Sequence, residues 1–208
     1  MMVQAQLEQF SSVRERTFSM VQRLSQEQAD FSPTAGEWSV GEVVDHLLLA
    51  EAMYRVEIAT LIERTQIGQT PRIYRSFADL NAGPAIIPKD LLPFFDVPFT
   101  LLTVFMPSCI REWVARSQLV PIRHPDVTTP RQGRSVDKLC HVLVTSLDET
   151  KALFAAHPNL DYAKMIYQHP LLGVQNVPQL LDFMGLHEEL HQQQITRVLA
   201  NTRFPMAT

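Results

Sequence analysis

Apolar residues recur every three to four positions along four long stretches of the chain, the spacing that places them on one face of an α-helix. These stretches cover about residues 3–28, 39–64, 135–156 and 176–199. Polar and charged residues fill the positions between them, so each stretch predicts an amphipathic helix with one face toward a shared core. The pattern therefore predicts an all-α protein in which the long helices form a bundle.

The second and fourth predicted helices also carry local start signals. Ser39 and Glu42 have the spacing of a capping box, and Trp38 stands just before them as a hydrophobic staple. Asn176 is placed to cap the last helix, and Pro178 suits its first turn, where the missing N–H needs no partner. We therefore expect helices that begin close to these residues.

The region between the second and third predicted helices, about residues 66–133, has a different composition. It contains nine of the fourteen prolines of the chain, too closely spaced for long uninterrupted helices. It is also apolar, as in DLLPFFDVPFTLLTVFMP, whereas a flexible linker would be polar. We predict an ordered insertion with short helical pieces around 90–95 and 100–117, within a single domain that spans residues 1–208. Its role as a lid, a pocket wall or a partner surface stays open.

Composition narrows the class of protein. The apolar fraction of 46% and the charged fraction of 19% are those of an ordinary globular domain. A net charge of −4 gives no electrostatic footprint for nucleic acid or for an anionic membrane. Cys109 and Cys140 form no CxxC motif, and no signal pattern or stretch of about 18 apolar residues occurs. We expect a reduced, cytoplasmic protein without nucleic-acid or membrane partners.

The predicted helices carry histidines that are candidate metal ligands. His187 and His191 are four residues apart on the apolar face of the last helix, so their rings can share one metal ion. The pair fits a hydrogen-bonded polar core equally well. His46 faces the interior of the second helix or its margin, where it is either a core-edge histidine or a third ligand. His141 falls on the polar side of its helix and is left out of the site.

The sequence HEELH, residues 187–191, formally matches the HExxH signature of zinc proteases, in which the glutamate is the general base. Those enzymes take a third ligand from downstream. After Glu189 the chain has no further acidic residue, and His191 is its last histidine. A protease site of this type cannot be completed, so any third ligand must lie upstream.

Three motifs occur in a distinctive order: Trp38-Ser39-x-x-Glu42-x-x-x-His46-Leu47, then His169-Pro170-x-x-Gly173, then His187-Glu188-Glu189-x-His191-x-x-Gln194-Ile195. Together they resemble the DinB/YfiT-like superfamily, over about residues 3–65 and 135–200. The resemblance implies an up-down-down-up four-helix bundle with a proline-rich insertion between helices 2 and 3. It also implies a divalent ion, zinc or nickel, held by His46, His187 and His191. Gln194, one turn beyond, is either a hydrogen-bond donor beside the ligands or part of the pocket lining, or else a residue of the core.

The resemblance also implies a function. Its characterised members include thiol-dependent transferases and isomerases, in which the metal lowers the pKa of a low-molecular-weight thiol. Three neutral imidazoles leave one coordination position open, which is typical of catalytic sites. We therefore expect a homodimeric S-transferase that acts on a small electrophilic molecule. No catalytic residue is assigned. Candidates for binding an anionic thiol lie in the insertion: Arg72, Arg75, Arg123, Arg131 and Arg134.

Two alternatives remain from the sequence. One is a hydrolase in which the metal activates water and Glu188 acts as the base, although Glu188 lies about 100° around the helix from His187. The other is a non-catalytic, stress-related bundle whose ion only holds the helices together.

Overall fold

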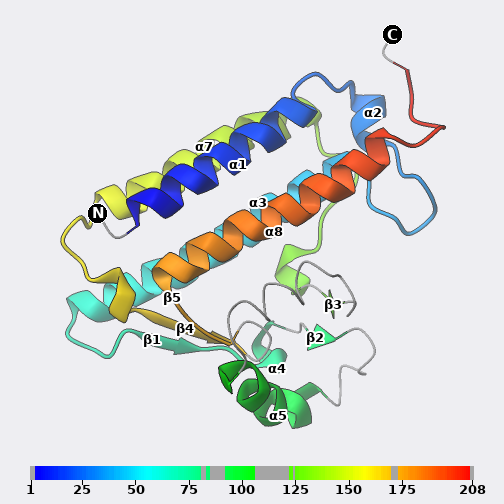
Figure 1. Cartoon of the computed structure of the whole chain (residues 1–208). Coiled ribbons are helices and arrows are strands. Elements are labelled where there is room, and N and C mark those ends of the chain that lie inside the picture. Colours follow the sequence, from blue (N-terminus) through cyan, green and yellow to red (C-terminus); the bar gives the residue numbers. More distant parts are fainter. Residues whose placement is uncertain are drawn as a thin grey trace. The chain divides into compact units, whose positions relative to one another are not determined.

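The computed structural model describes residues 3–80, 83–84, 92–105, 122–123, 125–169 and 173–206 (Figure 1). These residues are mostly helical, as the sequence predicts. Contacts group the chain into two compact units: Met1–Arg55, Pro130–Leu160 and Leu181–Thr208 form the first, and Val56–Thr129 and Asp161–Leu180 form the second.

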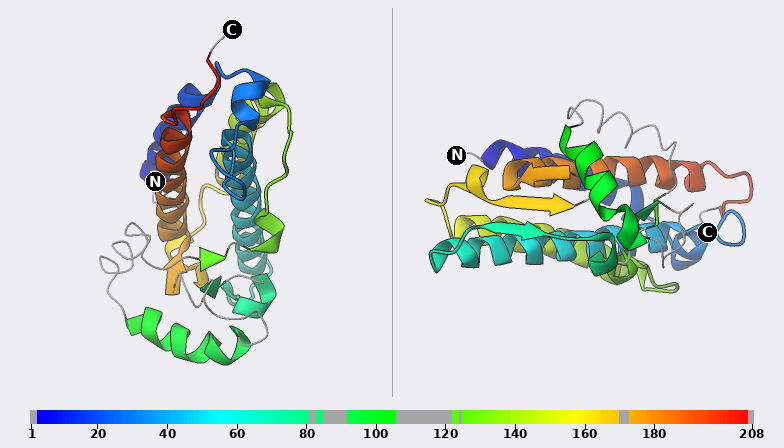
Figure 2. Two further views of the ribbon diagram at one scale, coloured as in Figure 1. Left: turned by 90° about the vertical axis from the view of Figure 1, so that its right-hand side faces the viewer. Right: turned by 90° about the horizontal axis from the view of Figure 1, so that it is seen from below.

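The long helices and one short helix account for the first unit. They are α1 (Gln4–Val21), α2 (Gln26–Asp30), α3 (Val40–Gln66), α7 (Val136–Ala155) and α8 (Val177–Leu199), with α3 and α8 continuing into the second unit. Figure 2 shows the first-unit parts of α3 and α8 side by side. The helix predicted at 135–156 matches α7 to within one residue at either end.

The predicted N-terminal helix at 3–28 is wrong in one respect, because it is two helices. α1 ends at Val21, and α2 begins after Ser25. The Ser25 hydroxyl accepts from Gln28 N–H at 3.2 Å, and the Gln28 side chain accepts from Ser25 N–H at 3.0 Å. This reciprocal cap satisfies the backbone groups that open α2, so it competes with continuation of α1.

The predicted helix starts are confirmed. Ser39 N–H donates to the Glu42 carboxylate at 2.9 Å, and Glu42 N–H donates to the Ser39 hydroxyl at 3.2 Å. Asn176 makes an equivalent pair of bonds with Gln179, both of 3.0 Å. These caps set where α3 and α8 begin, and therefore which faces of the two helices carry the histidines.

Apolar side chains from four helices form the core of the first unit. The buried members are Val21, Val40, Val43, Val44, Leu47, Leu48, Leu139, Leu143, Ile195 and Val198. They include residues from the apolar faces predicted for the second, third and fourth helices. Burial of this surface is the main stabilising contribution to the unit.

A buried charged network joins the same helices. Arg14 of α1 donates to both Glu188 oxygens at 2.9–3.1 Å, to Glu51 of α3 at 2.9 Å, and to the Leu143 carbonyl of α7 at 2.9 Å. The side chains of Arg14, Glu51 and Glu188 are only 2–3% exposed. Burial alone would lower the pKa of Arg14, but the charges of Glu188 and Glu51 outweigh it and raise that pKa. Arg14 therefore stays charged and neutralises two carboxylates inside the unit.

The second unit contains a three-stranded sheet of order β1-β4-β5, with β1 (Arg72–Tyr74), β4 (Ile166–His169) and β5 (Gly173–Asn176). β1 runs parallel to β4, and β4 antiparallel to β5. The structure has a 3-10 turn, Tyr162–Lys164, followed by β4. This strand forms by pairing with β1, which is distant in sequence, so the local spacing of apolar residues does not predict it.

The remaining elements of this unit are α4 (Phe77–Leu80), β2 (Gly83–Pro84), α5 (Leu92–Phe105), β3 (Ile122–Arg123) and η2 (Asp126–Thr128). α5 joins what were predicted as two helical pieces. Pro98 lies inside it, where the ring removes a hydrogen-bond donor without ending the helix. The predicted helical residues 106–117 lie outside the described part of the chain.

Two further expectations concern compartment and membrane. Among the described residues, no helix combines the length and the apolar character needed to cross a bilayer. Cys140 carries a free thiol. Cys109 lies outside the described residues.

Candidate metal site

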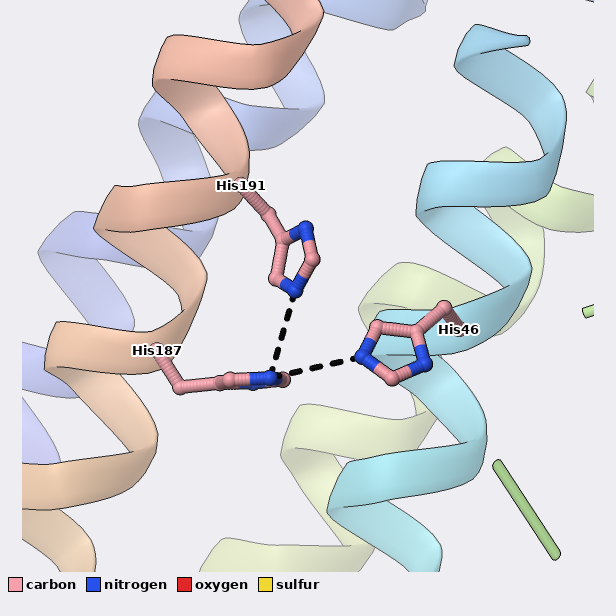
Figure 3. Close-up of side chains that lie close together, drawn as sticks. All are labelled: His46, His187 and His191. Carbon is pink, nitrogen blue, oxygen red and sulfur yellow. Dashed lines mark hydrogen bonds between the residues drawn. The ribbon is translucent and has the colours of Figure 1, made fainter. Parts of the chain in front are cut away.

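Three imidazole rings meet between α3 and α8 in the first unit (Figure 3). His187 Nε2 lies 3.3 Å from His46 Nε2 and 3.2 Å from His191 Nε2. The nearest nitrogens of all three rings fall within 4.8 Å of one another. His46 is 3% exposed, and the other two are half-buried. The structure therefore brings together the three histidines that the sequence proposed as ligands.

Local structure explains how they meet. His187 and His191 are one turn apart on α8, so their side chains leave the same face. His46 follows Asp45, a completely buried residue of α3. The Asp45 carboxylate accepts from Arg131 N–H at 2.9 Å and forms an ion pair with the Arg134 guanidinium. These bonds tie the segment before α7 to α3 beside His46.

Hydrogen bonds between neutral imidazoles cannot fully satisfy both ring contacts of His187. His191 Nδ1 lies 2.9 Å from Gln194 Oε1, which can only accept, so Nδ1 carries the proton and Nε2 keeps its lone pair. His187 Nε2 lies close to the Nε2 atoms of both other rings, and it carries either one proton or one lone pair. A single N–H cannot serve both contacts fully, and a lone pair would face that of His191. A cation bound by all three nitrogens removes the conflict.

The distances also fit an ion. Metal–nitrogen bonds to zinc are about 2.0–2.1 Å, so two ligands at a tetrahedral angle have nitrogens about 3.3 Å apart. The two contacts of His187, 3.3 and 3.2 Å, match this separation. The donor set and these two separations therefore suit a divalent metal such as zinc or nickel.

Aromatic rings surround the three histidines. The Trp38 ring centre lies 4.9 Å from that of His46, and 6.2 Å from that of His191 at an angle of 20°. Phe183 stacks on His187 with centres 6.0 Å apart, and Tyr54 meets Phe183 edge-on. These rings restrict the orientation of the imidazoles and lower the local polarity. Sequence reasoning treated Trp38 only as a staple and missed this contact.

Glu188 is not part of the site. Its carboxylate is 2% exposed and binds Arg14 and the Thr17 hydroxyl. This agrees with the predicted angular separation of Glu188 from His187. Gln194, by contrast, lies beside the ligand candidates as considered, but its side-chain oxygen accepts from His191 Nδ1, whereas the sequence suggested a donor.

Most of the arginines considered for anion binding already have partners. Arg75 binds the buried Glu57 through two bonds of 2.8 and 2.9 Å, and Arg134 pairs with Asp45. The Arg131 side chain is 69% exposed and lies 3.7 Å from Asp45. The side chain of Arg123 is outside the described part, and that of Arg72 is exposed.

Two further histidines considered in the sequence, His141 and His169, do not belong to this group of three rings. His141 is exposed on α7, as predicted. His169 ends β4 in the second unit, is 3% exposed and meets Phe77 edge-on at 5.8 Å. Burial lowers its pKa from 6.5 to about 4, and the charge of Asp79 opposes part of that effect.

His169 gives a pH prediction. Above about pH 6.5 it is neutral in both the folded and unfolded states; between 6.5 and about 4 only the unfolded chain takes up the proton. The free energy of unfolding should therefore fall as the pH drops through this window, by roughly 3 kcal/mol in total from this group. Urea unfolding of wild type and His169→Phe at pH 7.5 and 4.5 measures it. A parallel pH dependence in both proteins would contradict the assignment.

Fold and site together define a mostly helical protein with three histidines able to hold one metal ion. The family model of the DinB superfamily matches residues 9–195. The chain therefore belongs to the DinB superfamily. The matched range includes all three site histidines and runs across the proline-rich middle. Neither the comparison with curated proteins nor that with solved structures gave a match.

Proposed function

We propose that the protein is a metal-dependent enzyme in which His46, His187 and His191 bind one divalent ion, zinc or nickel. The observation that carries this proposal is the convergence of three ring nitrogens within 4.8 Å of one another, with His187 Nε2 at 3.3 and 3.2 Å from the other two. The proposal includes an up-down-down-up arrangement of α1, α3, α7 and α8, with residues 66–133 as an insertion between the second and third of them. A rigid pair of helices would hold the ligands in place.

The proposed reaction is transfer of a low-molecular-weight thiol to a small electrophilic molecule. An ion held by three neutral imidazoles keeps its full positive charge and a free coordination position, and so lowers the pKa of a thiol or water bound there. The protein would orient the histidines and exclude bulk water through Trp38 and Phe183. In the transfer, the thiol proton would pass to solvent and the thiolate sulfur would form a bond to the electrophilic carbon, while the bond from that carbon to its leaving group breaks and the leaving group departs to solvent with the electron pair.

The position of Glu188 favours thiol transfer over hydrolysis. A hydrolase of the HExxH type needs this carboxylate as a base beside the metal-activated water. Glu188 instead accepts three bonds from Arg14 and one from Thr17. A thiol has an ordinary pKa far below that of water, so it needs less help from a protein base. The hydrolase and the non-catalytic metal-binding bundle are the competing functions.

The proposal also places the protein in a reduced, cytoplasmic setting as a homodimer with a small-molecule substrate. The setting rests on the cysteine pattern, and the homodimer on the family resemblance.

The test is metal content, measured by elemental analysis on untagged protein. Wild type should contain one equivalent of zinc or nickel, and His46→Ala should contain none because only two ligands remain. His141→Ala is the matched control, since it removes an exposed histidine of α7. Absence of metal from wild type, even after reconstitution, would overturn the proposal.

Activity assays on the metal-loaded protein then separate the functions. Thiol transfer predicts metal-dependent conjugation of cysteine or glutathione to chlorodinitrobenzene. Turnover of a nitrophenyl ester without thiol would favour the hydrolase. The non-catalytic bundle would be favoured if the metal raises thermal stability but the protein shows neither activity and binds no thiol.

A further inference from the structure

Each histidine of α8 is followed by a residue that binds α1. His187 precedes Glu188, and His191 precedes Gln192. Glu188 accepts from the Arg14 side chain. Gln192 donates to the Val13 carbonyl of α1 at 2.8 Å. Two neighbouring faces of α8 therefore have different tasks: one presents imidazoles, and the other is hydrogen-bonded to α1.

Thr17 of α1 links the two α8 residues on the second face. Its hydroxyl donates to Glu188 Oε1 at 2.6 Å and accepts from Gln192 Nε2 at 2.9 Å. Thr17 is fully buried, and Glu188 is 2% exposed. A buried hydroxyl with both a donor and an acceptor role occupied allows few other orientations of the groups around it.

We propose that Thr17 and Gln192 are positioning residues for the metal site, acting through the rotation of α8 about its own axis. This inference rests on the proposed metal-binding function. The Arg14–Glu188 ion pair also links α1 to α8 and contributes to the same positioning. Glu188 of the HEELH sequence thus serves to orient the two histidines beside it instead of acting as a base.

The required accuracy shows why apolar packing alone would not suffice. A ring nitrogen of a helix-borne histidine lies about 6 Å from the helix axis, so a rotation of about 10° moves it by about 1 Å. Metal–ligand distances tolerate changes of only about 0.2 Å. Apolar contacts accept small shifts of this kind at little cost, whereas hydrogen bonds are directional. The bonds of Glu188 and Gln192 to α1 can therefore hold the rotation within the range that the ion needs.

The test removes this hydrogen-bonded link without exposing a charge. Thr17→Val/Gln192→Leu deletes the Thr17–Glu188, Thr17–Gln192 and Gln192–Val13 bonds, while Arg14 still neutralises Glu188. Zinc affinity is measured by competition with a coloured chelator, and coordination geometry by the visible absorption of the cobalt(II) protein. We expect affinity to fall about tenfold and the cobalt bands to change in intensity. Thr17→Ser, which keeps the hydroxyl, should retain both properties.

The matched control uses the same two helices. Arg16 of α1 and Glu189 of α8 form an exposed ion pair of 2.9 Å, and Arg16→Ala/Glu189→Ala should leave affinity and spectrum unchanged. Thr17→Val alone nearly preserves side-chain volume and carries the test if the double variant does not fold.

The outcomes separate this inference from the proposed function. Wild-type protein that binds neither zinc nor cobalt would overturn both. Wild type that binds them, together with a folded double variant of unchanged affinity and spectrum, would overturn the inference alone. A loss of affinity in Thr17→Ser equal to that in Thr17→Val would also overturn it, because the hydroxyl would then have no role.

Discussion

Replacing Arg14 by alanine is expected to lower the free energy of unfolding by about 3–5 kcal/mol. Arg14 is the charged partner of both Glu188 and Glu51, and all three side chains are almost completely buried. Without it, the one side-chain bond that Glu188 keeps within the described part of the chain is that from the Thr17 hydroxyl. Glu51 keeps the hydrogen bond from the Thr150 hydroxyl and a longer ion-pair contact of 3.6 Å to Arg55. The cost arises from two carboxylates left in a poorly hydrated interior. Urea unfolding at neutral pH measures it.

Two further variants show whether burial of charge is the cause. Arg16→Ala, on the same helix, breaks an exposed pair and should change stability by no more than about 1 kcal/mol. Arg14→Met/Glu51→Leu/Glu188→Leu replaces the whole network by apolar groups and should recover most of the stability lost in Arg14→Ala. A cost below about 1 kcal/mol for Arg14→Ala would mean that water reaches these carboxylates in solution.

His187→Ala should abolish stabilisation by metal. A ligand that binds only the folded state at one hundred times its dissociation constant stabilises by about 2.7 kcal/mol. Wild type with zinc should therefore unfold at a higher temperature than wild type treated with a chelator. His187 has the largest expected effect because its Nε2 lies between those of His46 and His191. Thermal unfolding followed by circular dichroism, with zinc and with chelator, measures the shift and checks that helical content remains.

His141→Ala serves as the reference for this experiment, because it removes an exposed imidazole from the same unit. It should keep the full zinc-dependent shift. If His187→Ala also keeps the shift, zinc binds elsewhere and the ligand assignment is wrong.

The features that the sequence predicted well are those set by local spacing. The period of about 3.6 residues and the caps at Ser39 and Asn176 locate α3 and α8 and assign their inward faces. The inward position of both α8 histidines follows from that period alone. His46 needed the family resemblance, because no local rule indicates which inward residue of α3 will face α8.

The features that the sequence did not predict depend on contacts between distant residues. Strand β4 exists because residues 166–168 pair with residues 72–74, and periodicity within four residues contains no trace of that pairing. The position of Trp38 against His46 and His191 likewise depends on how α3 and α8 pack. The contacts of Glu188 also depend on a residue that is distant in sequence. Its sequence suggests a catalytic base, and only the position of Arg14 makes it a buried ion-pair partner.

The separation of the ligands along the chain bears on how the protein is made. His46 and His187 are 141 residues apart. At a synthesis rate of about 5–20 residues per second, His46 leaves the ribosome about 7–28 seconds before His187 does. During that time a nascent chain offers an ion only one of the three imidazoles. The proposed ion could therefore be held by all three histidines only once residues 187 and 191 have also been synthesised, 141 residues or more after His46.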